Sequence, residues 1–269
     1  MIMSSRFSRA SLSAILIGTA LGGVVLTDAR ESLAQVGLDP MVIQAEVGRG
    51  QAQGVLTVTN PGNQPMRVRL YAEPFTYSCD AGFTSLSEDE NDLSPYLQFS
   101  PREFVVPPGQ RQRVRVVGLL PPSLPESEYR AVIFTESLPE GTTANESTAG
   151  IQTRIGSTVY FHQPGAGPAL SVVTASVDLE DSHIALLVSN TGESTARPKA
   201  KWTLRKGSET VATGESSATT VIEGGDRTLQ LPYDVNSLPS GNYELSGELV
   251  WLSGTQQQSQ DFSTSFSVQ

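Results

Sequence analysis

Residues 103–117 read Glu-Phe-Val-Val-Pro-Pro-Gly-Gln-Arg-Gln-Arg-Val-Arg-Val-Val. The tripeptide Pro107-Pro108-Gly109 is typical of a turn, and an apolar segment, Phe104 to Val106, precedes it. The segment that follows, Arg111 to Val117, alternates with a period of two. Its two faces carry Arg111, Arg113 and Arg115 on one side and Gln112, Val114 and Val116 on the other. This alternation predicts a strand of an antiparallel sheet, with one face in water and one face buried.

The same alternation occurs along the rest of the chain. Gly54 to Thr59 alternates and stops at the turn tripeptide Asn60-Pro61-Gly62, and Pro65 to Tyr71 alternates again. No segment after residue 34 shows a sustained helical period with capping residues. A Pro/Gly-rich stretch, Gln163 to Pro168, divides the strand candidates into two groups of about seven. The later group comprises residues 170–178, 183–190, 199–206, 209–213, 227–231, 242–252 and 260–268.

Short strands at this spacing predict an all-β protein of two immunoglobulin-like β-sandwich domains, residues 35–163 and 164–269.

The first 34 residues are typical of a secretion signal. Met1 to Arg9 carries two arginines and no acidic residue, and Ala10 to Thr27 is uncharged and largely apolar. Ser32-Leu33-Ala34 offers small residues at the two positions that a signal peptidase reads. We therefore expect a signal peptide over residues 1–34, cleavage after Ala34 and an exported chain that starts at Gln35. The alternative is an uncleaved N-terminal anchor, because the apolar stretch is about long enough to cross a bilayer.

The charge of the chain excludes some classes of partner. The whole sequence has a net charge of −10, and removal of residues 1–34, with three arginines and two acidic residues, makes it −11. A protein this acidic repels polyanions, so nucleic acid is not expected as a partner. Beyond the signal there is no apolar run of transmembrane length, and we expect a chain that is not embedded in a membrane.

No motif for catalysis is present. The chain has two histidines, His162 and His183, and one cysteine, Cys79, which has no partner for a disulfide within the chain. Neither a Gly-x-Ser-x-Gly elbow nor a His-Glu-x-x-His pair occurs. The acidic run Ser87 to Asp92 lacks the spacing of a calcium loop and is expected to be a solvated loop. The sequence predicts a non-enzymatic protein without a cofactor or a metal.

Two segments of the first domain resemble a known family. Pro108-Gly109 followed by Gln112-x-Val114-Arg115, and Leu124-Pro125-x-x-Glu128, resemble the N-terminal domain of the PapD-like periplasmic pilus-assembly chaperones. Leu38 to Glu46 with 54–60 is similar to that family's first two strands, and Ile151 to Ile155 with Val159-Tyr160-Phe161 is similar to its last strand. The second domain is closer to a generic exported immunoglobulin-like module.

The resemblance implies a periplasmic chaperone that works by donor-strand complementation. A pilus subunit lacks its last strand, and the chaperone lends its own, which satisfies the open edge and fills the exposed groove. The implied partners are pilin-like subunits and an outer-membrane usher. The implied donor residues share one parity: Ile151, Thr153, Ile155, Val159 and Phe161.

The family also anchors the subunit's terminal carboxylate with an arginine on the first strand and a lysine on the last. This sequence has Met41 or a neighbour at the first position, and Gly156 or Val159 at the second. Arg154 and Arg49 are the possible replacements. The alternative function is a secreted adhesion or envelope scaffold protein of two immunoglobulin-like domains that performs no chaperoning.

Overall fold

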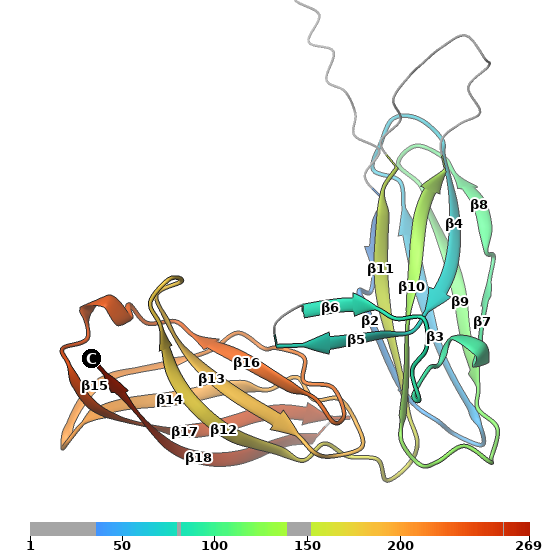
Figure 1. The fold of residues 1–269 in the computed structure, drawn as a ribbon. Coiled ribbons are helices and arrows are strands. Elements are labelled where there is room, and N and C mark those ends of the chain that lie inside the picture. Colours follow the sequence, from blue (N-terminus) through green and yellow to red (C-terminus); the bar gives the residue numbers. More distant parts are fainter. Residues whose placement is uncertain (1–35, 80–81, 139–151, 255) are drawn as a thin grey trace, which may run out of the picture. The chain divides into compact units, whose positions relative to one another are not determined.

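The computed structural model describes residues 36–79, 82–138, 152–254 and 256–269. The predicted signal peptide, its cleavage site and Gln35 lie outside these residues. The described chain is almost entirely strand, and its helices are two short 3-10 turns, η1 (Ser94–Tyr96) and η2 (Val235–Ser237). The predicted all-β class with immunoglobulin-like sandwiches is confirmed (Figure 1).

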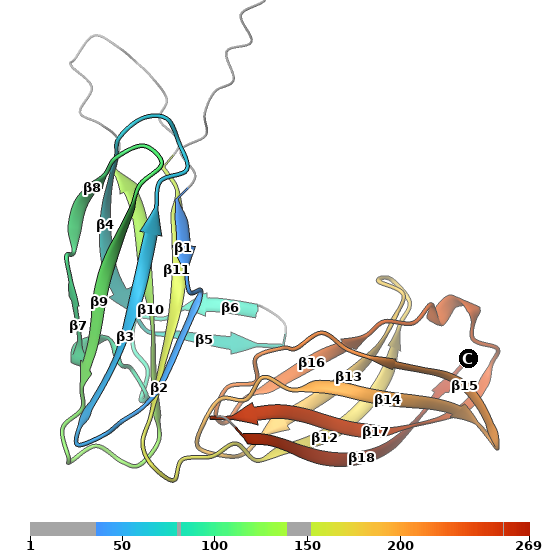
Figure 2. The same cartoon turned by 180° about the vertical axis from the view of Figure 1, so that it is seen from behind.

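The first sandwich consists of two sheets with strand orders β1-β3-β9-β7 and β2-β11-β10-β4-β8, and a separate two-stranded hairpin, β5-β6. Figure 1 shows it from the side of β10 and β11, and Figure 2 from the side of β3 and β9. Its strands are β1 (Gly37–Asp39), β2 (Val42–Glu46), β3 (Gln51–Thr59), β4 (Met66–Glu73), β5 (Phe75–Ser78), β6 (Gly82–Ser85), β7 (Leu97–Ser100), β8 (Glu103–Val106), β9 (Arg111–Leu119), β10 (Glu128–Leu138) and β11 (Arg154–His162).

The second sandwich consists of sheets with strand orders β12-β13-β16 and β15-β14-β17-β18. The interval between the two sandwiches, from the end of β11 at His162 to the start of β12 at Leu170, contains the Pro/Gly-rich stretch chosen as the domain boundary. The strands of the second sandwich are β12 (Leu170–Asp178), β13 (His183–Asn190), β14 (Lys199–Lys206), β15 (Glu209–Glu215), β16 (Asp226–Leu231), β17 (Gly241–Ser253) and β18 (Gln256–Val268).

Each sandwich has its own hydrophobic core, supplied by the inward positions of alternating strands. In β9, Val114 and Val116 are fully buried while Arg111, Arg113 and Arg115 are exposed, as the sequence predicts. Gln112 is an exception: it was expected on the inner face and is exposed, because it lies near the strand end, where Val58 of β3 is its partner. The second core centres on Trp202 of β14 and Tyr243 of β17.

The N-terminal segment does not form one strand. β1 pairs with β3 in one sheet, whereas β2 pairs in parallel with β11 in the other sheet. The change of sheet occurs at Pro40 and Met41, between the two strands. Proline has no N–H to donate to a ladder, so it is suited to a position where pairing stops.

The acidic run 87–92 is only partly solvated, which corrects the sequence-based expectation. The side chain of Asp89 is 13% exposed and lies 3.1 Å from Arg130 Nη2. Arg130, on β10, is 6% exposed. A buried guanidinium requires a counter-charge, and Asp89 supplies one, so this segment is bound to the sheet.

A tyrosine fixes the same corner of each sandwich. Tyr129 Oη donates to the carbonyl oxygen of Pro125 at 3.1 Å, and Tyr243 Oη donates to that of Pro239 at 2.6 Å. Each bond spans four residues and ties the start of a long strand to the loop before it, as in the tyrosine corner of immunoglobulin-like domains.

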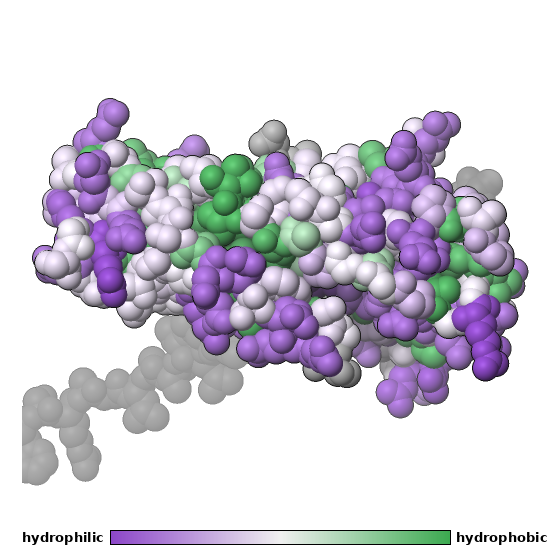
Figure 3. Space-filling view, turned by 90° about the horizontal axis from the view of Figure 1, so that it is seen from below, coloured by the Kyte–Doolittle hydropathy of each residue, from purple (hydrophilic) through white to green (hydrophobic). Residues whose placement is uncertain are grey.

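The surface of the described residues has no large hydrophobic face in the view of Figure 3, where hydrophobic residues form small patches among hydrophilic and neutral ones. The most exposed large hydrophobic residues are scattered along the chain and include Met41, Val105, Val173, Leu179 and Leu252. Cys79 is exposed and free. Among the described residues, no helix has the length and apolar character needed to span a bilayer.

We predict that Tyr129→Phe and Tyr243→Phe each lower the free energy of unfolding by about 1 kcal/mol, the usual net value of one hydrogen bond. Each substitution removes a hydroxyl that donates to a proline carbonyl and preserves the ring. Tyr233→Phe is the matched control, because no hydrogen bond of its hydroxyl is present in the described structure. Urea unfolding measures the difference. Equal effects at positions 233 and 243 would mean that the corner bond contributes nothing.

Candidate functional site

The candidate site is the part of β11 that is paired on one side only. β11 pairs with β10 along its whole length, from Arg154 opposite Glu136 to His162 opposite Glu128. Its other side pairs with β2 only from Thr158 to His162. Because the N-terminal segment changes sheets at Pro40, the stretch from Arg154 to Ser157 has no strand on that side within the described residues.

The hydrogen-bonding direction of the backbone alternates along β11. Thr158 N–H donates to the carbonyl of Met41 at 3.0 Å, which places the backbone groups of even-numbered residues on the β2 side. Ser137 N–H donates to the carbonyl of Thr153 at 2.9 Å, which places those of odd-numbered residues on the β10 side. The N–H and C=O groups of Arg154 and Gly156 therefore point to the open side. An edge of this kind is a template for another strand.

The predicted donor residues do share one face, but they divide into two groups. Val159 and Phe161 have no exposed surface and belong to the core of the first sandwich. Thr153 and Ile155 are partly buried, and Ile155 packs at the margin of that core. Ile151 lies outside the described residues. The part of β11 that can offer side chains to a partner is thus the part before Ser157.

Ser157 closes the open stretch. Its side chain is buried and its Oγ donates to the carbonyl of Pro40 at 2.8 Å. The bond joins β11 to the point where the N-terminal segment changes sheets. No motif in the sequence indicates this role of Ser157.

Arg154 lies on the opposite face of β11 from Ile155 and is already engaged. Its Nη2 lies 2.9 Å from Glu73 Oε2, and its guanidinium lies 3.5 Å from the ring centre of Phe134 and 5.5 Å from that of Tyr71. The side chain is 43% exposed, so it can exchange Glu73 for another carboxylate.

Arg49 lies at the other end of the strand. It occupies the turn between β2 and β3 with φ 54°, beside the end of β2 at Glu46, which pairs with His162. Arg154 is eight residues from His162 along β11, about 26 Å at the usual rise of a strand. The two arginines therefore cannot bind the same carboxylate, and Arg154 is the one at the open edge.

An aromatic cluster on the outer face of the same sheet was not predicted from the sequence. The hairpin β5-β6 places Phe75 and Phe83 against the sheet, with ring centres 5.7 Å from Tyr160 and 6.3 Å from Phe134 respectively. Alternation of aromatic and small residues in 75–78, followed by Phe83 in the next short segment, is the signal that could have identified it. Phe134, one ring of this cluster, is also the ring on which the Arg154 guanidinium lies.

We predict that Phe161→Ala lowers the free energy of unfolding by about 3–5 kcal/mol, the cost of removing a fully buried aromatic side chain. Val105→Ala is the control, because Val105 is 57% exposed on β8 of the same sheet, and it should cost no more than about 0.5 kcal/mol. Chemical denaturation measures both. A small effect at Phe161 would mean that this side chain lies outside the core and is able, like Ile155, to face a partner.

Comparison with known proteins identifies similar folds but no similar sequence. No protein-family model matches the sequence, and no curated protein sequence matches it. Among solved structures, the class 5 fimbriae chaperone CfaA aligns over 86% of this chain and 99% of its own, with a TM-score of 0.53 and 11% identity. The CsuC chaperone, in a pre-assembly complex with CsuE from Csu pili of Acinetobacter baumannii, aligns over 85% and 98%, with a TM-score of 0.47 and 17% identity. The chain therefore has the two-sandwich immunoglobulin-like fold that is found in the fimbriae chaperone CfaA.

Proposed function

We propose that this protein is a periplasmic chaperone that binds pilin-like subunits by donor-strand complementation and delivers them to an outer-membrane usher. The observation that carries the proposal is the open edge of β11 from Arg154 to Ser157, next to a fully paired and buried continuation of the same strand. The similarity of fold to a fimbriae chaperone supports it. Export through a signal peptide cleaved after Ala34 is part of the proposal.

The backbone of the edge is suited to strand addition but provides few bonds. Arg154 and Gly156 direct their N–H and C=O groups outward, and each net hydrogen bond contributes about 0.5–1.5 kcal/mol. Two residues alone do not hold a subunit with useful affinity. A partner strand must therefore also bury side chains from this part of β11.

The side chains available for burial are those of the inner face. Ile155 is partly buried at the margin of the core, so a partner's groove completes its burial without unfolding the sandwich. Full burial of a side chain of this size contributes about 1.5–3 kcal/mol. Thr153, just before the strand, has the same parity as Ile155, and Ile151 has it in the sequence but lies outside the described residues.

The rest of the first sandwich holds the edge in place. Val159 and Phe161 are anchored in the core, and Ser157 is bonded to Pro40. The edge is thus part of a rigid sheet and is presented before any partner arrives. Preorganisation of this kind lowers the entropy that binding costs.

Arg154 is proposed as the residue at this edge that contacts a carboxylate of the subunit. Its guanidinium now lies over β10 and β4, against Phe134 and Glu73, so this contact requires the side chain to leave both and turn to the open side of β11. Arg49 takes no part in this contact, because it lies at the far end of β11.

We predict that Ile155→Asp folds and is exported normally but no longer co-purifies with a pilin-like subunit, because a charge in the partner's apolar groove costs several kcal/mol. Val105→Asp is the matched control: it places the same charge at an exposed position of the same sheet, on β8, and should retain the subunit. Circular dichroism and affinity co-purification measure folding and binding.

A second variant tests the backbone separately. Arg154→Pro removes an N–H that points to the open side, and proline is tolerated at the first residue of a strand, so the sandwich should fold and the subunit should be lost. Arg154→Ala removes the same side chain but keeps the N–H, so it should lose only the carboxylate contact and retain more subunit than Arg154→Pro. Retention of the subunit by both Ile155→Asp and Arg154→Pro would contradict strand addition at this edge and favour a scaffold protein.

A further inference from the structure

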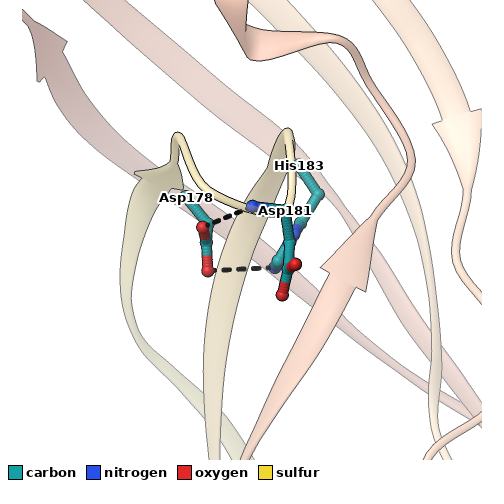
Figure 4. Close-up of side chains that lie close together, drawn as sticks. All are labelled: Asp178, Asp181 and His183. Carbon is teal, nitrogen blue, oxygen red and sulfur yellow. Dashed lines mark hydrogen bonds and ion pairs between the residues drawn. The ribbon is translucent and has the colours of Figure 1, made fainter.

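The turn between β12 and β13 brings together three side chains that the proposed function does not use. Asp178 ends β12 and His183 begins β13, and the two are direct cross-strand partners. Asp181 lies in the turn between them. Their ligand atoms all lie within 4.8 Å of one another, and Figure 4 shows the three side chains extending to the same side of the turn.

His183 is the observation that points to a ligand. Its side chain is only 10% exposed, and its nearest charged partner, Asp178 Oδ2, lies 3.9 Å from Nε2. That separation is too long for a hydrogen bond. Among the described residues, neither ring nitrogen of His183 takes part in a hydrogen bond, and neither is among the fully buried polar atoms without a partner, so the ring is covered while its nitrogens stay accessible. The ring is therefore nine-tenths buried, with a nitrogen directed at a carboxylate that it does not reach.

The separation fits a metal ion between the two groups. Zinc lies about 2.0–2.1 Å from a histidine nitrogen and about 2.0–2.2 Å from a carboxylate oxygen. Two such ligands in a tetrahedral arrangement are about 3.4 Å apart, so a shift of about half an ångström closes the observed 3.9 Å. Asp181 is exposed, so its carboxylate can move to complete the set.

The carboxylate of Asp178 is oriented for this role. Its Oδ1 accepts hydrogen bonds from the N–H groups of Glu180 and Asp181, each at 3.0 Å. Oδ2 remains free of backbone bonds and faces His183. Outer bonds that orient a ligand in this way are typical of metal sites.

The turn itself is held against the neighbouring loop. Ser182 Oγ donates to Asp234 Oδ1 at 2.9 Å, and Asn236 Nδ2 donates to Ser182 Oγ at 3.0 Å. The two bonds fix the backbone between Asp181 and His183, so the three side chains start from a defined geometry.

We propose that Asp178, Asp181 and His183 bind one Zn²⁺ ion at the β12-β13 turn. One imidazole and two carboxylates suit zinc better than calcium or magnesium, which take all-oxygen sites. Three protein ligands leave a fourth position for water. The ion joins the ends of two adjacent strands, and it stabilises the second sandwich because it binds the folded state.

Isothermal titration of the untagged, chelator-treated full chain with ZnCl₂ tests the proposal. We expect one ion per chain, and at least a tenfold loss of affinity in Asp181→Asn and in Asp178→Asn. Asparagine at 178 keeps an oxygen for the two backbone N–H groups, and Asp181 accepts no hydrogen bond in the described structure, so both variants should fold. Asp261→Asn, an exposed position on β18, is the matched control and should bind as the unchanged chain does.

Thermal unfolding provides the second measurement. Zinc should raise the unfolding midpoint of the unchanged chain and of Asp261→Asn, and should leave the midpoints of Asp178→Asn and Asp181→Asn unchanged. Absence of titratable binding in the unchanged chain would overturn the proposal and leave His183 and Asp178 as an ordinary ion pair. Equal binding by the unchanged chain and the two site variants would show adventitious binding to surface carboxylates, which also overturns it.

Discussion

The change of sheet at Pro40 governs the first sandwich. β1 closes one sheet against β3, and β2 closes the other against β11, so no single N-terminal strand can pair with the whole of β11. Thr158 to His162 receive a parallel partner, while Arg154 to Ser157 have none in the part of the chain that the structure describes. The hydrogen bond from Ser157 Oγ to the carbonyl of Pro40 lies at the boundary between the part of β11 that pairs with β2 and the part that does not. An unsatisfied backbone edge beside a buried core strand follows from this one crossing.

The consequence is a strand with two functions along its length. Its later half is structural, because Val159 and Phe161 fill the core. Its earlier half carries outward backbone groups at Arg154 and Gly156 and a partly buried Ile155. A protein that must present an apolar edge without aggregating benefits from a short one, bordered by charge. Arg154 begins the edge, and its charge lies back over the outer face of the sheet, against Phe134 of β10 and Glu73 of β4.

Much of the fold could be predicted because the strands alternate cleanly. In β9, the alternation of Val114 and Val116 with three arginines predicted both the strand and its buried face. The sequence could not predict that β11 has a buried half and an open half. Its alternation places Ile155 and Phe161 on one face, but it does not tell which of the two is buried in the chain's own core. Burial in β11 depends on pairing with residues that are distant in the sequence. The same holds for Asp89: the composition of its segment predicts a solvated loop, but Asp89 pairs with Arg130. The proximity of His183 to Asp178 and Asp181 was not predicted either, because the geometry of the turn brings the three side chains together.

The central claim is that the outward amides of Arg154 and Gly156 pair with a partner strand. Residue-resolved hydrogen exchange, on the chain alone and on its complex with a co-expressed pilin-like subunit, tests it most directly. We expect fast exchange of these two amides in the free chain and at least a tenfold slowing in the complex. The amide of Thr158, already bonded to Met41, should be slow in both. Unchanged exchange at Arg154 and Gly156 in a stable complex would mean that no strand adds at this edge.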